Sequence, residues 1–256
     1  RTRLQVSAAR GLTRFIGRDA ELEQLRAALE RARAGHGQVV ALVGEPGVGK
    51  SRLVWELARS HRTDGWLVLE SSSVSYGKST AFLPIIDLLR TYLGIEDRDD
   101  VRRVREKLTG KLLTLDEGLR PTLPAFQFLL DLLVEDAEWK SLGPDQQRQR
   151  VLDAVKRLLL RESQVQPLLL VFEDLHWIDA DTQALLESLV EGLPSHRLLL
   201  LVNYRPEYQH GWGSKTYYGQ IRLDPLAPDT AETLLEVLLG NDAGLVPLKS
   251  LLIERA

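Results

Sequence analysis

The sequence contains no cysteine and no methionine. Without thiols the chain forms no disulfide bond and offers no thiolate ligand to a metal. This is compatible with a reducing cytosol, and we expect a cytoplasmic location. No apolar run approaches the roughly 18 residues that a membrane-spanning helix requires, so we expect no membrane partner. The chain also lacks a basic excess, because 33 Lys and Arg stand against 36 Asp and Glu. This balance argues against direct nucleic-acid binding by the segment.

Apolar residues, in contrast, are plentiful and make up 44% of the 256 residues. That length and composition fit one large domain, or a core domain with a small appendage. The chain starts at Arg1 and stops within a run of helical pattern, residues 248–256. We therefore expect it to be a segment of a longer polypeptide.

One glycine-rich segment, residues 44–51, organises the rest of the sequence. It reads Gly-Glu-Pro-Gly-Val-Gly-Lys-Ser and matches G-x-x-x-x-G-K-S/T, the phosphate-binding loop of P-loop nucleotidases. A buried-strand pattern, residues 39–43, precedes it, and a helical pattern, residues 51–58, follows. Glycines let backbone N–H groups turn toward an anion, and the helix adds its positive end. Lys50 is placed to reach the β- and γ-phosphates, and the Ser51 hydroxyl to ligate Mg²⁺.

The turn ahead of this strand carries Phe15-Ile16-Gly17-Arg18-Asp19. A helical pattern covers residues 20–34, and Asp19 is the expected N-cap. Phe15 and Ile16 either form a hydrophobic staple or supply apolar contacts to a purine ring, and the residue types leave both readings open.

A second decisive stretch is Leu168 to Asp174, in which five apolar residues form a strand that ends in two carboxylates. Ligands of open parallel α/β sheets bind beyond the carboxyl ends of the strands. Glu173 and Asp174 are therefore expected beside the glycine-rich loop. A nucleotidase needs one acid to hold Mg²⁺ and another to orient or deprotonate the attacking water.

Polar residues also follow the neighbouring apolar runs. Asp179 is the expected N-cap of a helix over residues 180–190. His176 either packs the turn before that helix, or contacts nucleotide or relays a signal. After the apolar run 198–202, Asn203 and Arg205 are placed to sense a γ-phosphate, although a loop arginine paired with a surface acid is the alternative. Between about residues 81 and 163 no strand pattern occurs, and we expect several helices.

Together these residues resemble the STAND class of AAA+-related P-loop ATPases. The resemblance rests on Phe-Ile-Gly-Arg at 15–18, the glycine-rich loop, Glu-Asp-Leu-His-Trp-Ile-Asp at 173–179, Arg205, and Leu-Asp-Pro-Leu at 223–226. It covers nearly the whole chain, from about residue 11 onward. The most similar modules occur in bacterial regulators, where they follow a nucleotide cyclase domain, or precede helical repeats or a LuxR-type DNA-binding domain.

The resemblance implies an α/β fold, a P-loop NTPase three-layer α/β/α sandwich around a parallel sheet of strand order 5-1-4-3-2. It implies a linker or arm at residues 1–14, a core at 15–223 with a helical insert at about 81–163, and the start of a helical lid at 224–256.

The resemblance also implies roles for individual residues. Ile16, Gly17 and Arg18 would lie on the adenine side of ATP or ADP, and Arg205 matches the sensor arginine. Glu173 would help hold Mg²⁺ with Ser51, and Asp174 would act on water; the usual residue at the first position is Asp, so Glu173 departs from the pattern. The expected metal ligands are Ser51, Glu173 and Asp174. The expected catalytic residues are Lys50, Glu173, Asp174 and Arg205. The other expected nucleotide contacts are Gly44, Glu45, Pro46, Gly47, Val48, Gly49, Lys50, Ser51 and Arg52.

The leading hypothesis is an ATP-binding and slowly ATP-hydrolysing switch domain of a multidomain bacterial signalling or transcription regulator. Its output domain, cyclase-like or DNA-binding, would lie outside this segment. The alternative is a regulatory module that holds ADP or ATP with little or no hydrolysis and acts through nucleotide-dependent homo-oligomerisation or through the output domain.

Overall fold

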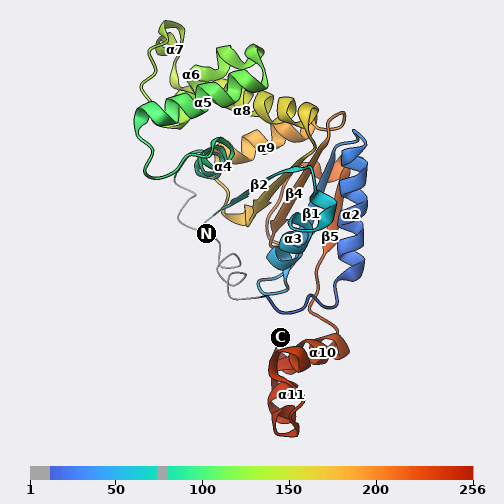
Figure 1. Ribbon diagram of the computed structural model, residues 1–256. Coiled ribbons are helices and arrows are strands. Elements are labelled where there is room, and N and C mark those ends of the chain that lie inside the picture. Colours follow the sequence, from blue (N-terminus) through green and yellow to red (C-terminus); the bar gives the residue numbers. More distant parts are fainter. Residues whose placement is uncertain (1–11, 74–79, 256) are drawn as a thin grey trace.

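The computed structural model describes residues 12–73 and 80–255, so the arm expected at 1–14 lies almost wholly outside the described residues (Figure 1). A sheet of five parallel strands forms the centre, in the order β2-β3-β4-β1-β5. This confirms the predicted order 5-1-4-3-2. The strands are β1 (Gln38–Val43), β2 (Leu67–Ser72), β3 (Leu168–Glu173), β4 (Leu198–Tyr204) and β5 (Tyr218–Arg222).

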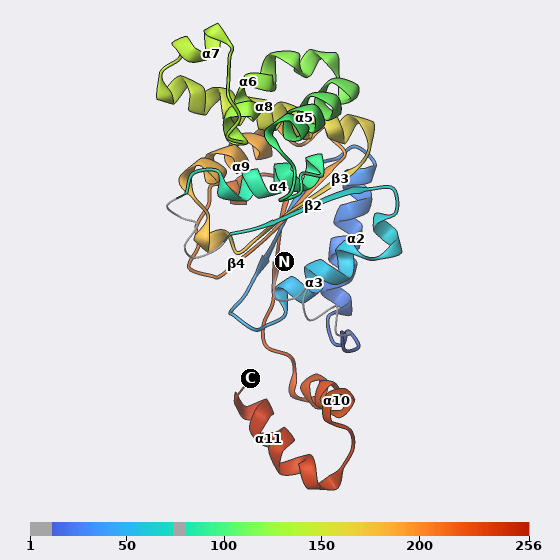
Figure 2. The ribbon, with the colours of Figure 1, turned by 60° about the vertical axis from the view of Figure 1, so that its left-hand side comes forward.

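Helices cover both faces of this sheet (Figures 1 and 2). Helices α2 (Asp19–Arg33) and α3 (Lys50–Ala58) lie on one face, and α4 (Leu83–Leu93), α8 (Pro144–Val165) and α9 (Ala180–Gly192) on the other. Alternate residues of each strand point to opposite faces, so β1 and its neighbours feed two separate apolar cores. The near-continuous apolar strands are the pattern of a parallel sheet buried on both sides, and the three-layer sandwich is confirmed.

The chain between β2 and β3 forms helices, as expected. Beyond α4 they are α5 (Val101–Leu115), the 3₁₀ turn η3 (Glu117–Thr122), α6 (Leu123–Leu129), α7 (Ala137–Ser141) and α8. Pro124 and Pro144 stand in the first turns of α6 and α8, where a missing N–H costs no helical hydrogen bond. Helices α5 to α7 lie at the end of the molecule opposite to the C-terminal helices (Figure 1).

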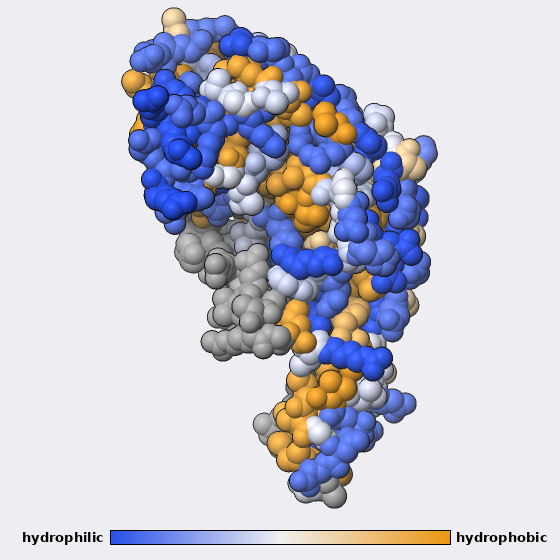
Figure 3. Space-filling model, in the orientation of Figure 1, coloured by the Kyte–Doolittle hydropathy of each residue, from blue (hydrophilic) through white to orange (hydrophobic). Residues whose placement is uncertain are grey.

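The C-terminal helices α10 (Pro228–Leu239) and α11 (Val246–Arg255) stand apart from the sheet (Figure 1). Apolar side chains gather on their surface (Figure 3). In the described ranges, no helix is both long enough and apolar enough to cross a membrane. The exposed apolar residues of α10 and α11 are Val237, Leu238, Leu239, Val246, Leu248, Leu251 and Leu252.

Two local predictions can be compared with the observed helix starts. Asp19 was expected as an N-cap, and this is wrong: α2 begins at Asp19 itself, Arg18 occupies the cap position, and no side chain caps the helix. Asp179 caps α9 as expected. Its Oδ1 accepts hydrogen bonds from the N–H groups of Asp181 and Thr182, at 3.1 and 3.0 Å. The same oxygen also accepts the N–H of Phe82 at 3.1 Å, so this buried carboxylate joins α9 to the start of α4.

Replacing Asp179 with Ala is expected to lower the free energy of unfolding by about 2–4 kcal/mol. Loss of a cap costs about 0.5–2 kcal/mol, and the buried N–H of Phe82 left without an acceptor adds about 1–3 kcal/mol. Urea denaturation measures the change. The matched control is Asp100→Ala, because exposed Asp100 caps α5 through one hydrogen bond, to Arg103 N at 2.8 Å. If Asp179→Ala lowered the free energy of unfolding no more than Asp100→Ala does, this would contradict the argument that Asp179 joins α9 to the start of α4.

Candidate functional site

The glycine-rich loop joins the end of β1 to the start of α3. Gly47 and Gly49 have φ angles of 90° and 96°, a left-handed conformation that residues with a Cβ rarely adopt. These two glycines let the chain reverse direction and begin α3 at Lys50. The first four N–H groups of the helix have no partner within it, and with the helix dipole they form a site suited to an anion.

The Lys50 side chain lies within the curve of this loop. Its Nζ donates hydrogen bonds to the carbonyl oxygens of Gly44, at 2.7 Å, and Glu45, at 2.9 Å. Burial lowers the pKa of Lys50 below its ordinary value, while the nearby Asp174 carboxylate opposes this shift. The ammonium is thus positioned by backbone carbonyls near Asp174, which directly follows β3.

Asn203 connects the two acids to the strand beside them. The register of β3 and β4 pairs Phe172 with Val202, so Glu173 and Asn203 follow side by side at the end of the two strands. The Asn203 Nδ2 donates to Glu173 Oε2 at 3.0 Å, and its Oδ1 accepts the N–H of Asp174 at 2.8 Å. Asn203 is 1% exposed. Its amide therefore fixes the Glu173 side chain and the Asp174 backbone at once.

Glu173 also lies near the loop, because the Ser51 hydroxyl is close enough to its carboxylate to influence its pKa. Burial raises the pKa of Glu173 above its ordinary value; Ser51 and the Asn203 amide oppose the rise, and the Asp174 carboxylate adds to it. A hydroxyl and a carboxylate side by side are the hard oxygen ligands that Mg²⁺ prefers.

A cavity of about 600 Å³ opens on the other side of the loop. Its walls come from the N-terminal turn, the loop, and the C-terminal helices α10 and α11. The lining is largely apolar, which suits a flat heterocyclic base. The predicted nucleotide contacts among its lining residues are Ile16, Arg18, Pro46, Gly47, Val48, Gly49 and Arg52.

The chain matches the AAA ATPase domain family over residues 14–202, which is more than half of its length. It belongs to the AAA ATPase domain family. An uncharacterised protein from Rhizobium meliloti is 26% identical over 231 residues, covering 87% of this chain and 21% of that protein. The chain therefore spans about a fifth of the curated relative that it matches.

Several solved structures have folds similar to that of this chain. A chain in the HORMA–CdnC–Trip13 complex from Escherichia coli has a TM-score of 0.52 at 9% identity, over 99% of this chain and 77% of that chain. The Aeropyrum pernix ORC1 protein, solved with DNA, has a TM-score of 0.49 at 17% identity, over 95% and 56%. A STAND protein with a tetratricopeptide repeat sensor from Pyrococcus horikoshii has a TM-score of 0.42 at 14% identity, over 88% and 25%. At these identities the first likeness shows the fold alone.

Within this AAA ATPase domain, Arg18 and Arg52 make protein contacts around the cavity. Arg18 forms an ion pair with Glu21 at 2.8 Å and donates to the carbonyl oxygens of Val48, at 3.3 Å, and Asp224. It thereby joins the start of α2, the loop and the segment that leads to α10. Arg52 pairs with Glu56 at 2.7 Å.

Gly17, Gly44 and Glu45 have different surroundings from the other predicted contacts. A Cβ on Gly17 would lie 2.2 Å from Thr230 Cγ2, so this glycine allows the N-terminal turn to pack against α10. Gly44 and Glu45 line a second cavity of about 470 Å³, with residues from the end of β5 and the segment after β4. The predicted contacts are thus spread over two cavities, and Val48 lines both of them.

Arg205 follows β4 and is half-buried. No ion pair joins its guanidinium to an acid within the described part of the chain. The surface ion pair considered as its alternative role is therefore not observed there. The positive charge of Arg205 lowers the pKa values of Lys50 and His176, which places Arg205 at the same end of the site.

The sequence did not predict that the Asn203 amide holds both Glu173 and Asp174. Its position at the end of a buried strand was the one signal that the sequence offered.

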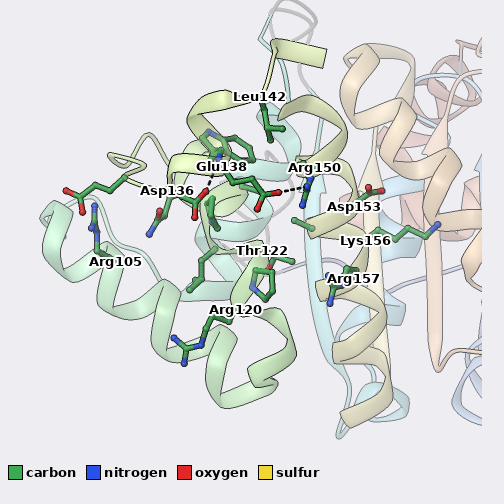
Figure 4. Close-up of a pocket in the computed structure, with 18 residues that line it drawn as sticks. Arg105, Arg120, Thr122, Asp136, Glu138, Leu142, Arg150, Asp153, Lys156 and Arg157 are labelled. Carbon is green, nitrogen blue, oxygen red and sulfur yellow. Dashed lines mark hydrogen bonds and ion pairs between the residues drawn. The ribbon is translucent and has the colours of Figure 1, made fainter. Parts of the chain in front are cut away.

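Another cavity, of about 1000 Å³, lies elsewhere, among the helices between β2 and β3 (Figure 4). Its walls come from α5 to α8 and the segments between them. An ion pair of 2.8 Å between Arg150 and Glu138 crosses it, and Arg157 donates to the carbonyl of Gly118 at 3.1 Å. The cavity shares no lining residue with the predicted phosphate contacts.

Replacing Glu173 with Gln is expected to stabilise the nucleotide-free protein at pH 8 by about 0.5–2 kcal/mol, the range of stabilising single substitutions. Because the folded-state pKa of Glu173 is raised, the folded chain holds this proton more tightly than the unfolded chain. The associated stability is present below the ordinary pKa of 4.5 and is lost as pH rises through the folded-state pKa. Gln, being always neutral, avoids that loss.

Thermal unfolding in EDTA at pH 8 and at pH 4.5 measures this effect. The gain from Glu173→Gln should be present at pH 8 and shrink toward pH 4.5. Glu232→Gln, on the exposed surface of α10, is the control and should change little at either pH. A gain that is equal at both pH values would contradict the argument.

Proposed function

We propose that this chain binds Mg-ATP and hydrolyses it slowly, as a switch domain of the STAND class within a cytoplasmic, multidomain bacterial regulator. One observation carries the catalytic part of this proposal. The Asn203 amide hydrogen-bonds both to the Glu173 carboxylate and to the N–H of Asp174, and the Ser51 hydroxyl lies close to the same carboxylate. This group of residues stands beside Lys50 and the N-terminus of α3, the anion-binding part of the fold.

The proposed role of each residue follows from the chemistry of its side chain. Lys50 and the first N–H groups of α3 bind the β- and γ-phosphates, and Arg205 offsets charge on the γ-phosphate. Ser51 and Glu173 hold Mg²⁺, which when bound draws charge from the phosphate oxygens. Asp174, positioned through its own N–H, orients the attacking water and accepts its proton.

The donor set fits magnesium held partly by the nucleotide. Among the described residues there is no group of three or more His, Cys, Asp or Glu that could hold a metal by themselves. Mg²⁺ characteristically uses one or two carboxylates together with phosphate oxygens and water. Ser51 and Glu173 match that requirement, and Asp174 lies next in the chain.

The proposed adenine site and the proposed regulatory role rest on different observations. We place the adenine in the cavity of about 600 Å³ lined by Ile16 and Arg18, which α10 and α11 close from the C-terminal side. Residues 224–256 are then the start of the lid, and 15–223 the core. The Rhizobium meliloti relative extends well beyond the matched region, which supports an attached output domain. Nucleotide-dependent homo-oligomerisation is a further part of the proposal, tested by sizing the chain with each nucleotide.

Isothermal titration with Mg-ATP and Mg-ADP tests binding. The wild-type chain should bind both with micromolar dissociation constants, and Lys50→Ala should weaken ATP binding about 10- to 100-fold, because a hydrogen bond between charged groups contributes about 1.5–3 kcal/mol. Lys140→Ala, on the exposed surface of α7, is the control. Micromolar binding of ATP that is unchanged in Lys50→Ala would refute the proposal.

Single-turnover release of phosphate tests hydrolysis and the division of roles. Asp174→Asn should slow release about 10²- to 10⁴-fold while sparing nucleotide binding. Glu173→Gln should instead raise the Mg²⁺ concentration required. If Glu173→Gln stops turnover and Asp174→Asn does not, the two roles are reversed. If the wild-type chain binds ATP without releasing phosphate, the chain is a nucleotide-holding module.

A further inference from the structure

The segment that joins β4 to β5, residues 205–217, is rich in aromatic side chains. Tyr208 and Trp212 pack in the apolar core that also contains Val43, the last residue of β1. Arg205 has a role in the function proposed above, and the aromatic residues that follow it form a second set of contacts around it.

His210 lies at the centre of these contacts. Its Nδ1 accepts the N–H of Trp212 at 3.1 Å, and the two rings stack with their centroids 4.6 Å apart. An Nδ1 that accepts a hydrogen bond carries no proton, so the proton of the neutral ring is on Nε2. Burial favours this neutral form, because it lowers the pKa of His210. Nε2 lies 2.7 Å from the Tyr204 hydroxyl oxygen, and His210 therefore donates to Tyr204.

The Tyr204 hydroxyl extends this chain of hydrogen bonds to β5. It lies 2.9 Å from the Tyr218 hydroxyl, which donates to Gln220 Oε1 at 3.3 Å. Strand β1 lies between β4 and β5, so the chain crosses the strand that leads into the glycine-rich loop. Tyr204 is 3% exposed. A buried hydroxyl with partners on both sides holds its ring in one position.

Tyr204 is the last residue of β4, and Arg205 follows it directly. The Tyr204 carbonyl accepts the N–H of Gly44, the first residue of the loop, at 3.4 Å. The Arg205 carbonyl accepts the N–H of Tyr208 at 3.0 Å, and the Tyr208 hydroxyl donates to Gln183 on α9. The backbone of Arg205 is thus held from both sides, next to the start of the loop.

No ion pair joins the Arg205 guanidinium to an acid in the ranges that the structure describes, so its position depends on the backbone that carries it. We propose that His210 is a positioning residue for Arg205: its Nε2–H bond to Tyr204 fixes the end of β4, and with it the guanidinium that meets the γ-phosphate. ADP lacks that phosphate, so the contact selects for ATP. This inference rests on the proposed binding of ATP and adds the residue that holds its γ-phosphate contact in place.

Two substitutions of His210 separate its two hydrogen bonds. The amide of Asn lies where Nδ1 lies in His, and the longer side chain of Gln brings its amide to the position of Nε2. His210→Asn therefore keeps an acceptor for the Trp212 N–H and loses the bond to Tyr204, whereas His210→Gln keeps a donor for Tyr204. Tyr217→Phe is the matched control, because it removes a hydroxyl of the same segment that donates instead to the Val190 carbonyl, at 2.9 Å.

The test measures dissociation constants of Mg-ADP and of a non-hydrolysable Mg-ATP analogue. His210→Asn should weaken binding of the analogue about tenfold and leave that of ADP within about twofold, which also shows that the variant is folded. Tyr204→Phe, which removes only the hydroxyl, should reproduce this loss. His210→Gln and Tyr217→Phe should stay within about threefold of the wild type for both nucleotides. In a chain that carries Arg205→Ala, His210→Asn should have no further effect, because no guanidinium is left to position.

The inference is overturned if His210→Asn leaves the ratio of the two constants unchanged, or if His210→Gln loses as much as His210→Asn. It is also overturned if the effects of His210→Asn and Arg205→Ala multiply in the double variant. If Arg205→Ala alone left the ratio unchanged, the role assigned to Arg205 would be refuted, and this inference with it. Failure of the wild-type chain to bind either nucleotide would instead refute the proposed function itself.

Discussion

The arrangement of the site depends on one buried amide. Strand β4 lies between β3 and β1, so its last residues separate the acids that follow β3 from the loop that follows β1. Asn203 occupies that place and uses both ends of its side chain, one on the Glu173 carboxylate and one on the Asp174 backbone. Glu173 in turn meets Ser51 at the start of α3. Three parts of the chain, far apart in sequence, thus meet through short polar contacts at one edge of the sheet.

The polar groups around Asn203 lower the stability of the fold. The two apolar cores on either face of the sheet offset this loss. Glu173 is half-buried with a raised pKa, Asp174 has a left-handed backbone, and His176 has two buried nitrogens without a partner in the described structure. A left-handed residue with a Cβ costs on the order of 1 kcal/mol, and an unpaired buried polar group about 1–3 kcal/mol. Strained and unsatisfied groups tend to gather at functional sites, because the surrounding fold holds them in place. Here the buried apolar residues of β3 and the fully buried strand β4 provide that support.

The sequence predicted the parts of this site that follow a local rule. The spacing of glycines with Lys50 and Ser51, and the apolar run that ends at Glu173, are local patterns, and the strand order came from the family resemblance. The role of Asn203 depends on the register of two strands that lie 25 residues or more apart, which no local pattern encodes. The start of α2 was misplaced because Asp19 has the residue type of a cap without making its hydrogen bond. The cavity beside Ile16 was equally hidden, since its walls come from both ends of the chain.

The central claim is that the loop, the acidic pair and the N-terminal turn form one site for Mg-ATP. A crystal structure with Mg²⁺ and a non-hydrolysable ATP analogue tests it most directly. The account predicts the phosphates at the N-terminus of α3, the metal beside Ser51 and Glu173, and the adenine in the cavity lined by Ile16. A nucleotide bound in the cavity of the helical insert, or phosphates bound away from Lys50, would contradict it.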